Sequence, residues 1–496
     1  MNRLRPGLAV VIVSLMAMCA ACGQKSGVAL SASGSTAAGA TAGADSSIDA
    51  TGGAAADEPA SGDQTAATAA GASGTAASGG GGSTATTAKG PTAVGGAAPA
   101  GGAAGTASAT ATAKADRTGI DDAKKIIRIG VHAPVTGAAP IEQKTFELGR
   151  DVYFQFLKDK GGLYDGYTIE VDFRDDQFSP TVARQKCQEM VENDKVFLLV
   201  GAAGADQITS CARYAESVGV PYLSAGVNTD GLTGLSHYFA VSQTYAQQAP
   251  TIAGLIKTKI QKTKVGLAVL DTPDFVDARK AAIAALQAAG LQLVDDEKIP
   301  KTAGKAETDA TAANLAKAGA DVVYVLMSPT IYLNFTKSVH GQVGYDPDLV
   351  GPGLTVGLNL VAQAGCPDVA KTQVLSPFPQ LDAIDSLDPD YKAAYQKYVT
   401  AKNPQQQPDD IGVALWGLDK TLALMFQAAA PSADKLSRQS FVAAVTSGQE
   451  FASKVYPPVK FSASQHFGAS SSHLLQAQCT PPGPNFKTTA TFVSGF

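Results

Sequence analysis

Residues 196–224 read VFLLVGAAGADQITSCARYAESVGVPYLS and contain a complete strand–helix–strand pattern. The run 196–200 is short and apolar, as in a buried strand, and it leads into the glycine-bounded turn 201–204. The helix that follows carries one small or apolar face, formed by Ile208, Cys211, Ala212 and Ala215. That helix ends at Gly219, and 220–224 is the next strand. Two apolar strands joined through a helix predict parallel neighbours in one sheet.

The same alternation continues on both sides of this stretch. Ser179 followed by Pro180 is typical of a helix start, and Gly161 with Gly162 ends an earlier helix. Apolar runs predict strands at 126–131, 167–173, 265–270, 291–298, 322–327 and 349–350. Helical periodicity is found around Leu148, Val152 and Phe156 and at 277–289, 308–317, 391–401 and 411–429. Because the order repeats from residue 265, we expect an α/β protein of two lobes, each with helices on both faces of a parallel sheet.

The first residues form an export signal. Arg3 and Arg5 precede an apolar run, residues 8–18, which as a helix would rise only about 16 Å. A bilayer core of about 30 Å needs a longer helix, so residues 1–21 are predicted to be a signal peptide. Small residues before Cys22 resemble the bacterial lipobox, which predicts cleavage before Cys22 and lipid on its sulfur. Ordinary cleavage nearby, without lipid, is the alternative.

Residues 22–120 consist almost entirely of Ala, Gly, Ser and Thr. Such a segment cannot bury enough apolar surface to offset its ordering entropy, so we expect a disordered tether. The folded part is then 121–496. The net charge of −5, the single Trp and the lack of a basic run argue against a nucleic-acid partner.

Six cysteines are present, of which Cys19 leaves with the signal peptide and Cys22 takes lipid. The four that remain allow three pairings in an oxidising compartment. Cys187 and Cys211 fall on the inward faces of neighbouring predicted helices, which favours their pairing. Cys366 would then pair with Cys479 if the chain returns to the second lobe at its end. Buried free thiols are the alternative.

Catalytic and metal-binding signatures are missing from the sequence. No phosphate-binding glycine loop, no G-x-S-x-G after a strand in the folded part and no H-E-x-x-H occur, and the five His are scattered. We therefore expect a protein that is not an enzyme and that has no catalytic residue, cofactor or metal.

Five short motifs occur in order along the folded part. They are the strand and loop at 127–137, the helix ending KGGLYDG at 160–166, the Asp175-Asp176 element with Pro180, the Gly219-Val220-Pro221 turn and the helix ending GQVGY at 341–345. In this order and spacing they resemble the branched-chain amino acid-binding family of transporter receptors, the type I periplasmic-binding fold. The resemblance spans about residue 125 to the C-terminus.

The resemblance implies two Rossmann-like lobes joined by three crossovers, with the ligand cleft between them. Lobe 1 would hold about 121–242 and 377–450, and lobe 2 about 243–376 and 451–496. Because ligands bind beyond the C-terminal ends of parallel strands, the cleft loops are expected at 132–139, 202–206, 225–228, 243–245, 272–275, 327–330 and 353–355. The residues expected to bind ligand are Thr136, Ala203, Ala205, Asp206, Gly226, Asn228, Tyr245, Phe275, Ser328 and Gly353.

Carried over residue by residue, the family's carboxylate-binding Ser falls on Ala205, its backbone contact on Gly226 and its hydroxyl-bearing residue on Asn228. The acid that holds an α-ammonium falls on Gly353, whereas the aromatic residue is kept as Phe275. The loss of the acid argues against a plain branched-chain amino acid, although Asp206 would replace that acid if it turned inward. Structural readings remain open for several residues: a loop-capping hydroxyl at Thr136, a helix first-turn acid at Asp206, a buried structural histidine at His132, and core positions at Tyr332 and Trp416.

The family likeness implies an extracytoplasmic, lipid-anchored receptor that closes on a small polar metabolite, such as an amino acid-like compound, an amide or a carboxylate. Its expected partners are the solute, the permease of an ABC-type importer and, through Cys22, the membrane. A monomer is expected. One alternative is a sensory receptor of the same fold that signals to a partner protein, because fold alone does not choose between these roles. Another is a wall-tethered structural protein that binds nothing, which would have a cleft without convergent polar groups.

Overall fold

The computed structural model describes residues 115–137, 152–226, 228, 231–353, 358–481 and 483–496. These residues belong to one unit, Gly105–Phe496. The predicted signal peptide, the lipid site at Cys22, nearly all of the predicted tether, Leu148 and the loop positions 138–139 and 354–355 lie outside them. No helix in the described part of the chain is long and apolar enough to cross a membrane.

The first lobe is built on a sheet of six described strands in the order β1-β2-β4-β5-β6, with β3 also paired to β2. All neighbours are parallel except β1 and β2. The strands are β1 (Ile120–Asp121), β2 (Ile126–Ala133), β3 (Thr168–Asp175), β4 (Leu198–Gly201), β5 (Tyr222–Ser224) and β6 (Tyr238–Ala240). The predicted strands of this lobe are present, and β6 is an additional short one.

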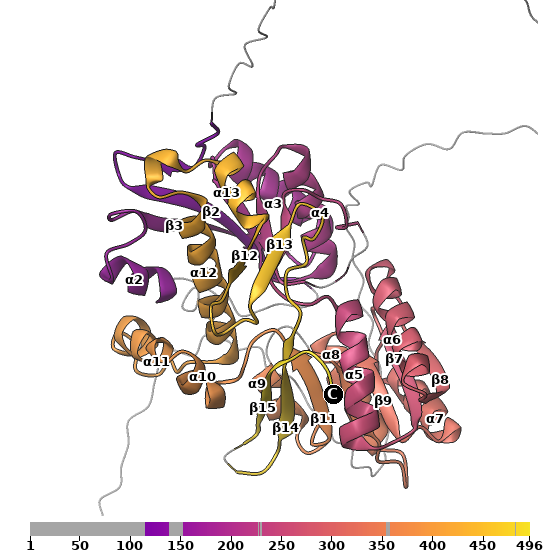
Figure 1. Cartoon of the computed structure of the whole chain (residues 1–496). Coiled ribbons are helices and arrows are strands. Elements are labelled where there is room, and N and C mark those ends of the chain that lie inside the picture. The colour runs from indigo at the N-terminus through magenta and orange to yellow at the C-terminus, as the bar shows by residue number, and fades with distance from the viewer. Residues whose placement is uncertain (1–114, 138–151, 227, 229–230, 354–357, 482) are drawn as a thin grey trace, which may run out of the picture. The chain divides into compact units, whose positions relative to one another are not determined.

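Helices from two parts of the chain cover this sheet, as Figure 1 shows. Those that precede β6 are α2 (Val152–Asp159), α3 (Pro180–Glu192) and α4 (Ala205–Ser217). Those from the later part are α12 (Asp410–Ala429) and α13 (Arg438–Val445). Two further helices, α10 (Leu381–Leu387) and α11 (Asp390–Tyr395), pack beside α12 and α2. The α3 helix starts as predicted, since Ser179 Oγ accepts a hydrogen bond from Val182 N and Pro180 is its first residue. Trp416 of α12 is fully buried in the core, where its ring packs against Tyr153 of α2 and Tyr391 of α11.

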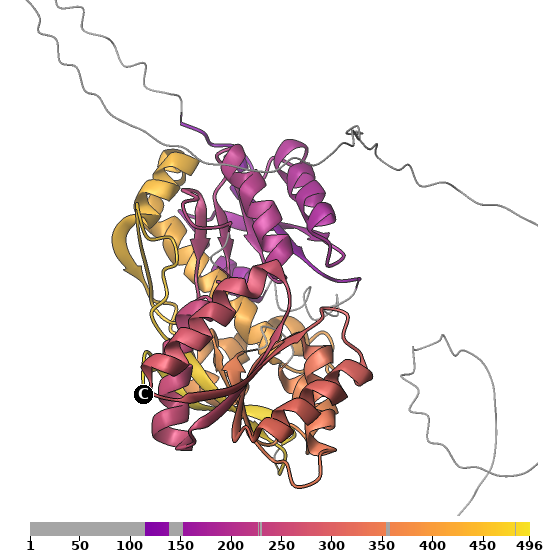
Figure 2. The same cartoon turned by 90° about the vertical axis from the view of Figure 1, so that its right-hand side faces the viewer.

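The second lobe is built on a sheet of seven described strands in the order β15-β14-β11-β10-β9-β7-β8. The parallel part is β7 (Lys264–Leu270), β8 (Gln292–Ile299), β9 (Val322–Leu326), β10 (Asp348–Pro352) and β11 (Thr372–Ser376). Two antiparallel strands extend it, β14 (Ser472–Gln478) and β15 (Asn485–Val493). The helices are α5 (Tyr245–Leu255), α6 (Val276–Ala288), α7 (Lys305–Ala318), α8 (Pro329–His340) and α9 (Leu358–Gly365). The C-terminal residues lie against α5, where Thr251 Oγ1 donates to Ser494 O (Figure 2).

The chain passes between the lobes three times, after β6, after β11 and before β14. The last passage comes later than the sequence predicts. The hairpin of β12 (Ser447–Phe451) and β13 (Val459–Ser462) places Phe451, Val459 and Phe461 in the core of the first lobe. The second-lobe segment expected from residue 451 therefore begins near Ser472, because these apolar side chains pack on α12 and the first sheet.

The described residues contain two disulfides, Cys187–Cys211 and Cys366–Cys479, in the pairing expected from the sequence. The first joins α3 to α4, which lie on the same side of β4, and both of its cysteines are fully buried. The second joins the end of α9 to the end of β14. Each disulfide therefore ties together elements of a single lobe.

Candidate functional site

Loops at the C-terminal ends of the strands in the two lobes contact each other. Lys301, from the loop after β8, places its Nζ 2.6 Å from Asp206 Oδ2 in the first turn of α4. The same Nζ lies 5.2 Å from the centre of the Phe178 ring, which precedes α3. Asn228, after β5, places Nδ2 3.4 Å from Asp274 Oδ1 in the loop after β7. The edges that sequence reasoning assigned to a ligand cleft are therefore next to each other.

The N-terminus of α4 is shaped by Gly204, which adopts φ 85° and provides no side-chain cap. Ala203 is buried against Ala133 and α12, and Ala205 is half-buried at the edge of the core. The first backbone N–H groups of a helix have no partner within the helix and carry partial positive charge. With no capping side chain from Gly204, this end of α4 is suited to an anionic group.

The loop after β5 needs a glycine at position 226. Gly226 N donates to Ser242 Oγ at 2.7 Å, and a Cβ on Gly226 would lie 2.3 Å from Ser242 O. Asn228 is fully buried, with Nδ2 also 3.5 Å from Thr209 Oγ1 on α4. Gly226 therefore offers only backbone, whereas Asn228 joins α4 to the second lobe.

Two aromatic residues of the second lobe pack together at the same edge. Tyr245 is the first residue of α5, which begins with a capping box formed by Thr244 and Gln247. Phe275 ends the short 3-10 turn Pro273–Phe275 that precedes α6. Their rings meet edge to face, with centroids 5.5 Å apart. The pair provides an apolar surface of the kind that lines solute sites.

Gly353 cannot carry the acid that an amino acid ligand would need at this position. A Cβ there would lie 2.4 Å from Leu375 O on the neighbouring strand. Backbone of β11 occupies the space where a side chain would begin, and Gly353 N donates to that same oxygen. Ser328 precedes α8, is half-buried and forms no side-chain cap.

Thr136 holds the loop after β2 against the end of β3 in this structure. Its hydroxyl donates to Asp175 Oδ2 at 2.6 Å, and the side chain is exposed. Burial raises the pKa of Asp175, but hydrogen bonds from Thr136, Gln177 and Val135 outweigh it and lower that pKa below the usual value. Asp175 thus remains a carboxylate that orders the loop after β2.

His132 belongs to a fully buried network at the end of β2. Its Nδ1 is 2.8 Å from Asp176 Oδ2, and its Nε2 is 2.7 Å from the Tyr222 hydroxyl. The Asp176 carboxylate can only accept, so Nδ1 carries the ring proton, and in that tautomer Nε2 accepts from the Tyr222 hydroxyl. Burial raises the pKa of Tyr222 well above its usual value, so this hydroxyl stays protonated. The nearby Cys187 and Cys211 are joined in a disulfide, which leaves His132 as the one metal-ligating group of that cluster. The network connects β2 to β5 as part of the core.

Sequence reasoning missed Gln207, Lys301 and Asp410. Gln207 is a polar residue on the inward face of α4, and its side chain is 1% exposed. Lys301 follows β8, so the rule that cleft loops follow parallel strands could have found it. Asp410 is buried at the start of α12, where its Oδ2 accepts from Asn359 N of α9 at 3.4 Å, and burial raises its pKa. In the sequence, Asp409 and Asp410 indicate only the start of a helix, so the burial of Asp410 could not be predicted from them.

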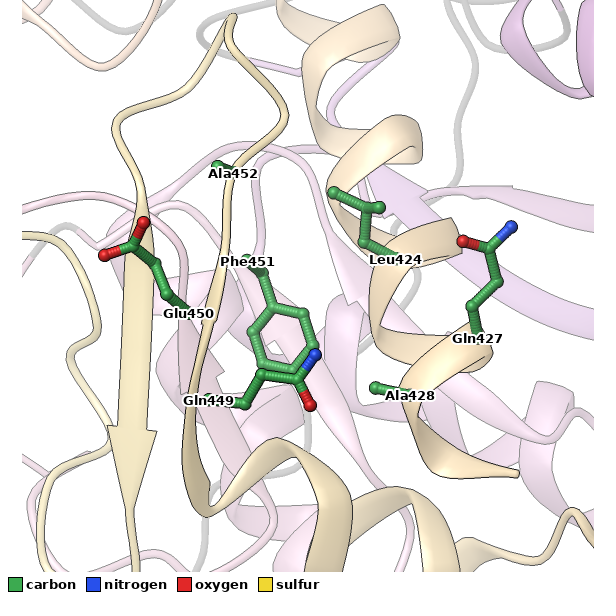
Figure 3. Close-up of a pocket in the computed structure, with 7 residues that line it drawn as sticks. All are labelled: Leu424, Gln427, Ala428, Gln449, Glu450, Phe451 and Ala452. Atoms are coloured by element: carbon green, nitrogen blue, oxygen red, sulfur yellow. The ribbon is translucent and has the colours of Figure 1, made fainter. Parts of the chain in front are cut away.

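A shallow groove lies elsewhere, between α12 and β12 (Figure 3). Glu450 points away from the helix in this view. The groove is lined by Leu424, Gln427, Ala428, Gln449, Glu450, Phe451 and Ala452. None of the expected ligand-binding residues lines it.

Comparison with known proteins matches residues 126–481 to the family model described as periplasmic binding protein. A curated relative, the Leu/Ile/Val-binding protein homolog 6 of Brucella abortus, is 28% identical over 177 residues. That match covers 35% of this chain and 44% of the relative, so the chain spans under half the length of the curated relatives it matches.

Solved structures share the fold, among them the following three. A fatty acid ABC transporter substrate-binding protein from Thermomonospora curvata has a TM-score of 0.64 and 19% identity, over 77% of this chain and 95% of that one. A solute-binding protein of Rhodopseudomonas palustris, in complex with 3,4-dihydroxybenzoic acid, has a TM-score of 0.61 and 19% identity, over 75% of this chain and 98% of that one. The LivJ protein of Streptococcus pneumoniae, in complex with isoleucine, has a TM-score of 0.61 and 18% identity, over 74% of this chain and 99% of that one.

Proposed function

This chain belongs to the periplasmic binding protein family, and from that membership we propose that it binds a small apolar or aromatic carboxylate between its lobes. It would deliver this solute to the permease of an ABC-type importer. The protein acts as a monomeric receptor outside the cytoplasm and catalyses no reaction. Closure of the lobes on the solute is the state that the permease would recognise.

The observation that carries the solute class is the pairing of Asp206 with Lys301 beside the uncapped N-terminus of α4. The N-terminus attracts a carboxylate, and Lys301 compensates the charge of the nearest acid. Gly353 has no space for the acid that would hold an α-ammonium. These three features together favour an anion that lacks a neighbouring amine.

The edge-to-face pair of Tyr245 and Phe275 supports an apolar body on that anion. Aromatic rings form favourable surfaces for flat or branched apolar groups. The structural relatives include proteins in complex with 3,4-dihydroxybenzoic acid, benzoate and isoleucine, so this fold accommodates molecules of that size.

Lipid on Cys22 is a second part of the proposal. The lipobox-like residues before Cys22 and the Ala/Gly/Ser/Thr-rich segment 22–120 support a receptor tethered to the membrane. Metabolic labelling with a palmitate analogue should mark the wild-type chain and leave Cys22→Ala unlabelled. Equal labelling of both chains would contradict anchoring at Cys22.

Thermal unfolding of the full chain tests the solute class. Benzoate, 4-hydroxybenzoate, hexanoate, leucine, isoleucine and glucose would each be added at millimolar concentration. A ligand at about 1,000 times its Kd adds about 4 kcal/mol to the free energy of unfolding, which raises Tm by several degrees. We expect one of the carboxylates without an amine to raise Tm most. A larger shift with leucine or isoleucine would contradict the reading of Gly353.

A further inference from the structure

The side-chain amide of Gln207 is buried without a hydrogen bond to its Nε2. Gln207 is 1% exposed, and Nε2 has no acceptor among the residues that the structure describes. Buried amide donors are nearly always paired, so a lone one calls for an explanation. A ligand oxygen is one such partner.

The amide lies at the N-terminal end of α4. Gln207 is the third residue of the helix and folds back over its start, since a Cβ on Gly204 would lie 2.2 Å from Gln207 Oε1. The side chain therefore adds an N–H donor to the backbone N–H groups at that end. Both kinds of donor favour an oxygen acceptor with negative charge.

The same turn faces the second lobe. Asp206, the residue before Gln207, contacts Lys301. Thr209, two residues after it, contacts Asn228, which in turn reaches Asp274. Gln207 is therefore flanked on α4 by residues whose contacts extend to the loops of the second lobe.

We propose that Gln207 Nε2 donates a hydrogen bond to the carboxylate of the bound solute and helps to determine solute specificity. It supplies a side-chain donor on a turn where Ala205 offers none. The nitrogen of a neutral amide can donate to a carboxylate and requires no counter-ion. Because it cannot accept a hydrogen bond, Nε2 offers nothing to an ammonium group. This inference rests on the proposed function and names a donor within that site.

The test compares binding of benzoate and of its neutral analogue benzamide to the full chain by titration calorimetry. Three variants are needed: Gln207→Leu, which removes the donor at similar size, Gln207→Glu, which replaces the donor by an acceptor, and Gln380→Leu as control. Gln380 is also a buried glutamine whose amide has no partner among the described residues, and its backbone N donates to Thr488 of β15, away from α4.

We expect Gln207→Leu to weaken benzoate binding about tenfold or more, with a Tm of the unliganded protein at least equal to wild type. Gln207→Glu should reverse the preference toward benzamide, while Gln380→Leu keeps wild-type affinity. Wild-type benzoate affinity in Gln207→Leu, when the unaltered chain binds benzoate, would overturn the role of Gln207 and leave the proposed function standing. An unaltered chain that binds neither benzoate nor any other carboxylate of the panel would overturn both.

Discussion

Lys301 Nζ contacts Asp206 Oδ2 at 2.6 Å and links the loop after β8 in the second lobe to α4 in the first. The side chains are 45% and 27% exposed, so water and salt screen the pair. The same ammonium lies over the ring of Phe178. A contact of this kind contributes little energy but is possible only when the lobes are close together.

The first prediction concerns this pair. Lys301→Met and Asp206→Asn should each lower the free energy of unfolding by about 0.2–1 kcal/mol, and the double variant should lose no more than one single variant. Urea unfolding at low salt and in 0.5 M NaCl measures this, and salt should erase the differences. Additive losses in the double variant would show that the two side chains act independently.

The second prediction concerns the His132–Asp176–Tyr222 network. Tyr222→Phe leaves His132 Nε2 buried without its donor and should cost about 1–3 kcal/mol in urea unfolding. Tyr324→Phe is the matched control, because the buried Tyr324 hydroxyl has no partner among the described residues. That variant should be neutral or more stable. An equal loss in both variants would mean that the hydrogen bond adds nothing.

The third prediction concerns Gly353. Gly353→Asp forces a Cβ toward Leu375 O and should destabilise the protein by about 1–3 kcal/mol, without creating a site for amino acids. Gly341→Ala is the control, since φ there is −71° and the nearest atom to a new Cβ is at 3.4 Å. The control should keep or slightly raise Tm. A stable Gly353→Asp protein that binds isoleucine would contradict this account.

The fourth prediction concerns pH. Burial lowers the pKa of His473 to about 4, although the hydrogen bond between Nε2 and Val455 O acts in the opposite direction. The folded pKa lies below the unfolded value of 6.5, so this stability is complete above pH 6.5 and is lost as pH falls toward 4. The loss amounts to about 3 kcal/mol, at 1.36 kcal/mol for each pH unit.

His473→Gln, which can still donate to Val455 O, isolates this effect. Between pH 7 and pH 4 its free energy of unfolding should fall by about 3 kcal/mol less than that of the wild type. Parallel pH profiles for the two proteins would contradict a depressed pKa at His473.

The elements that sequence reasoning found are those with long local patterns. The α3 helix is marked in the sequence by its N-cap Ser179 and by Pro180 at its first position. The β9 strand is marked by a run of five apolar residues, all of which are buried. The β6 strand has three residues, too few to show a period. The α5 helix was missed because Pro250 lies inside it and apolar residues surround it, which conceals the helical stripe. The site was predicted as loops after strands, a rule that also reaches Lys301 after β8. The pairing of Lys301 with Asp206 and the unpaired amide of Gln207 emerged only from the structure.

The sequence by itself determined the two α/β repeats and the residues on the inward faces of the helices, because backbone period and capping act over a few residues. Tertiary structure alone decided that β14 lies between β11 and β15 and that Phe451 packs in the first lobe. It also decided that Lys301 meets Asp206, 95 residues earlier in the chain. Such pairings depend on where the crossovers carry the chain, and no local pattern encodes the distance between loops of two sheets.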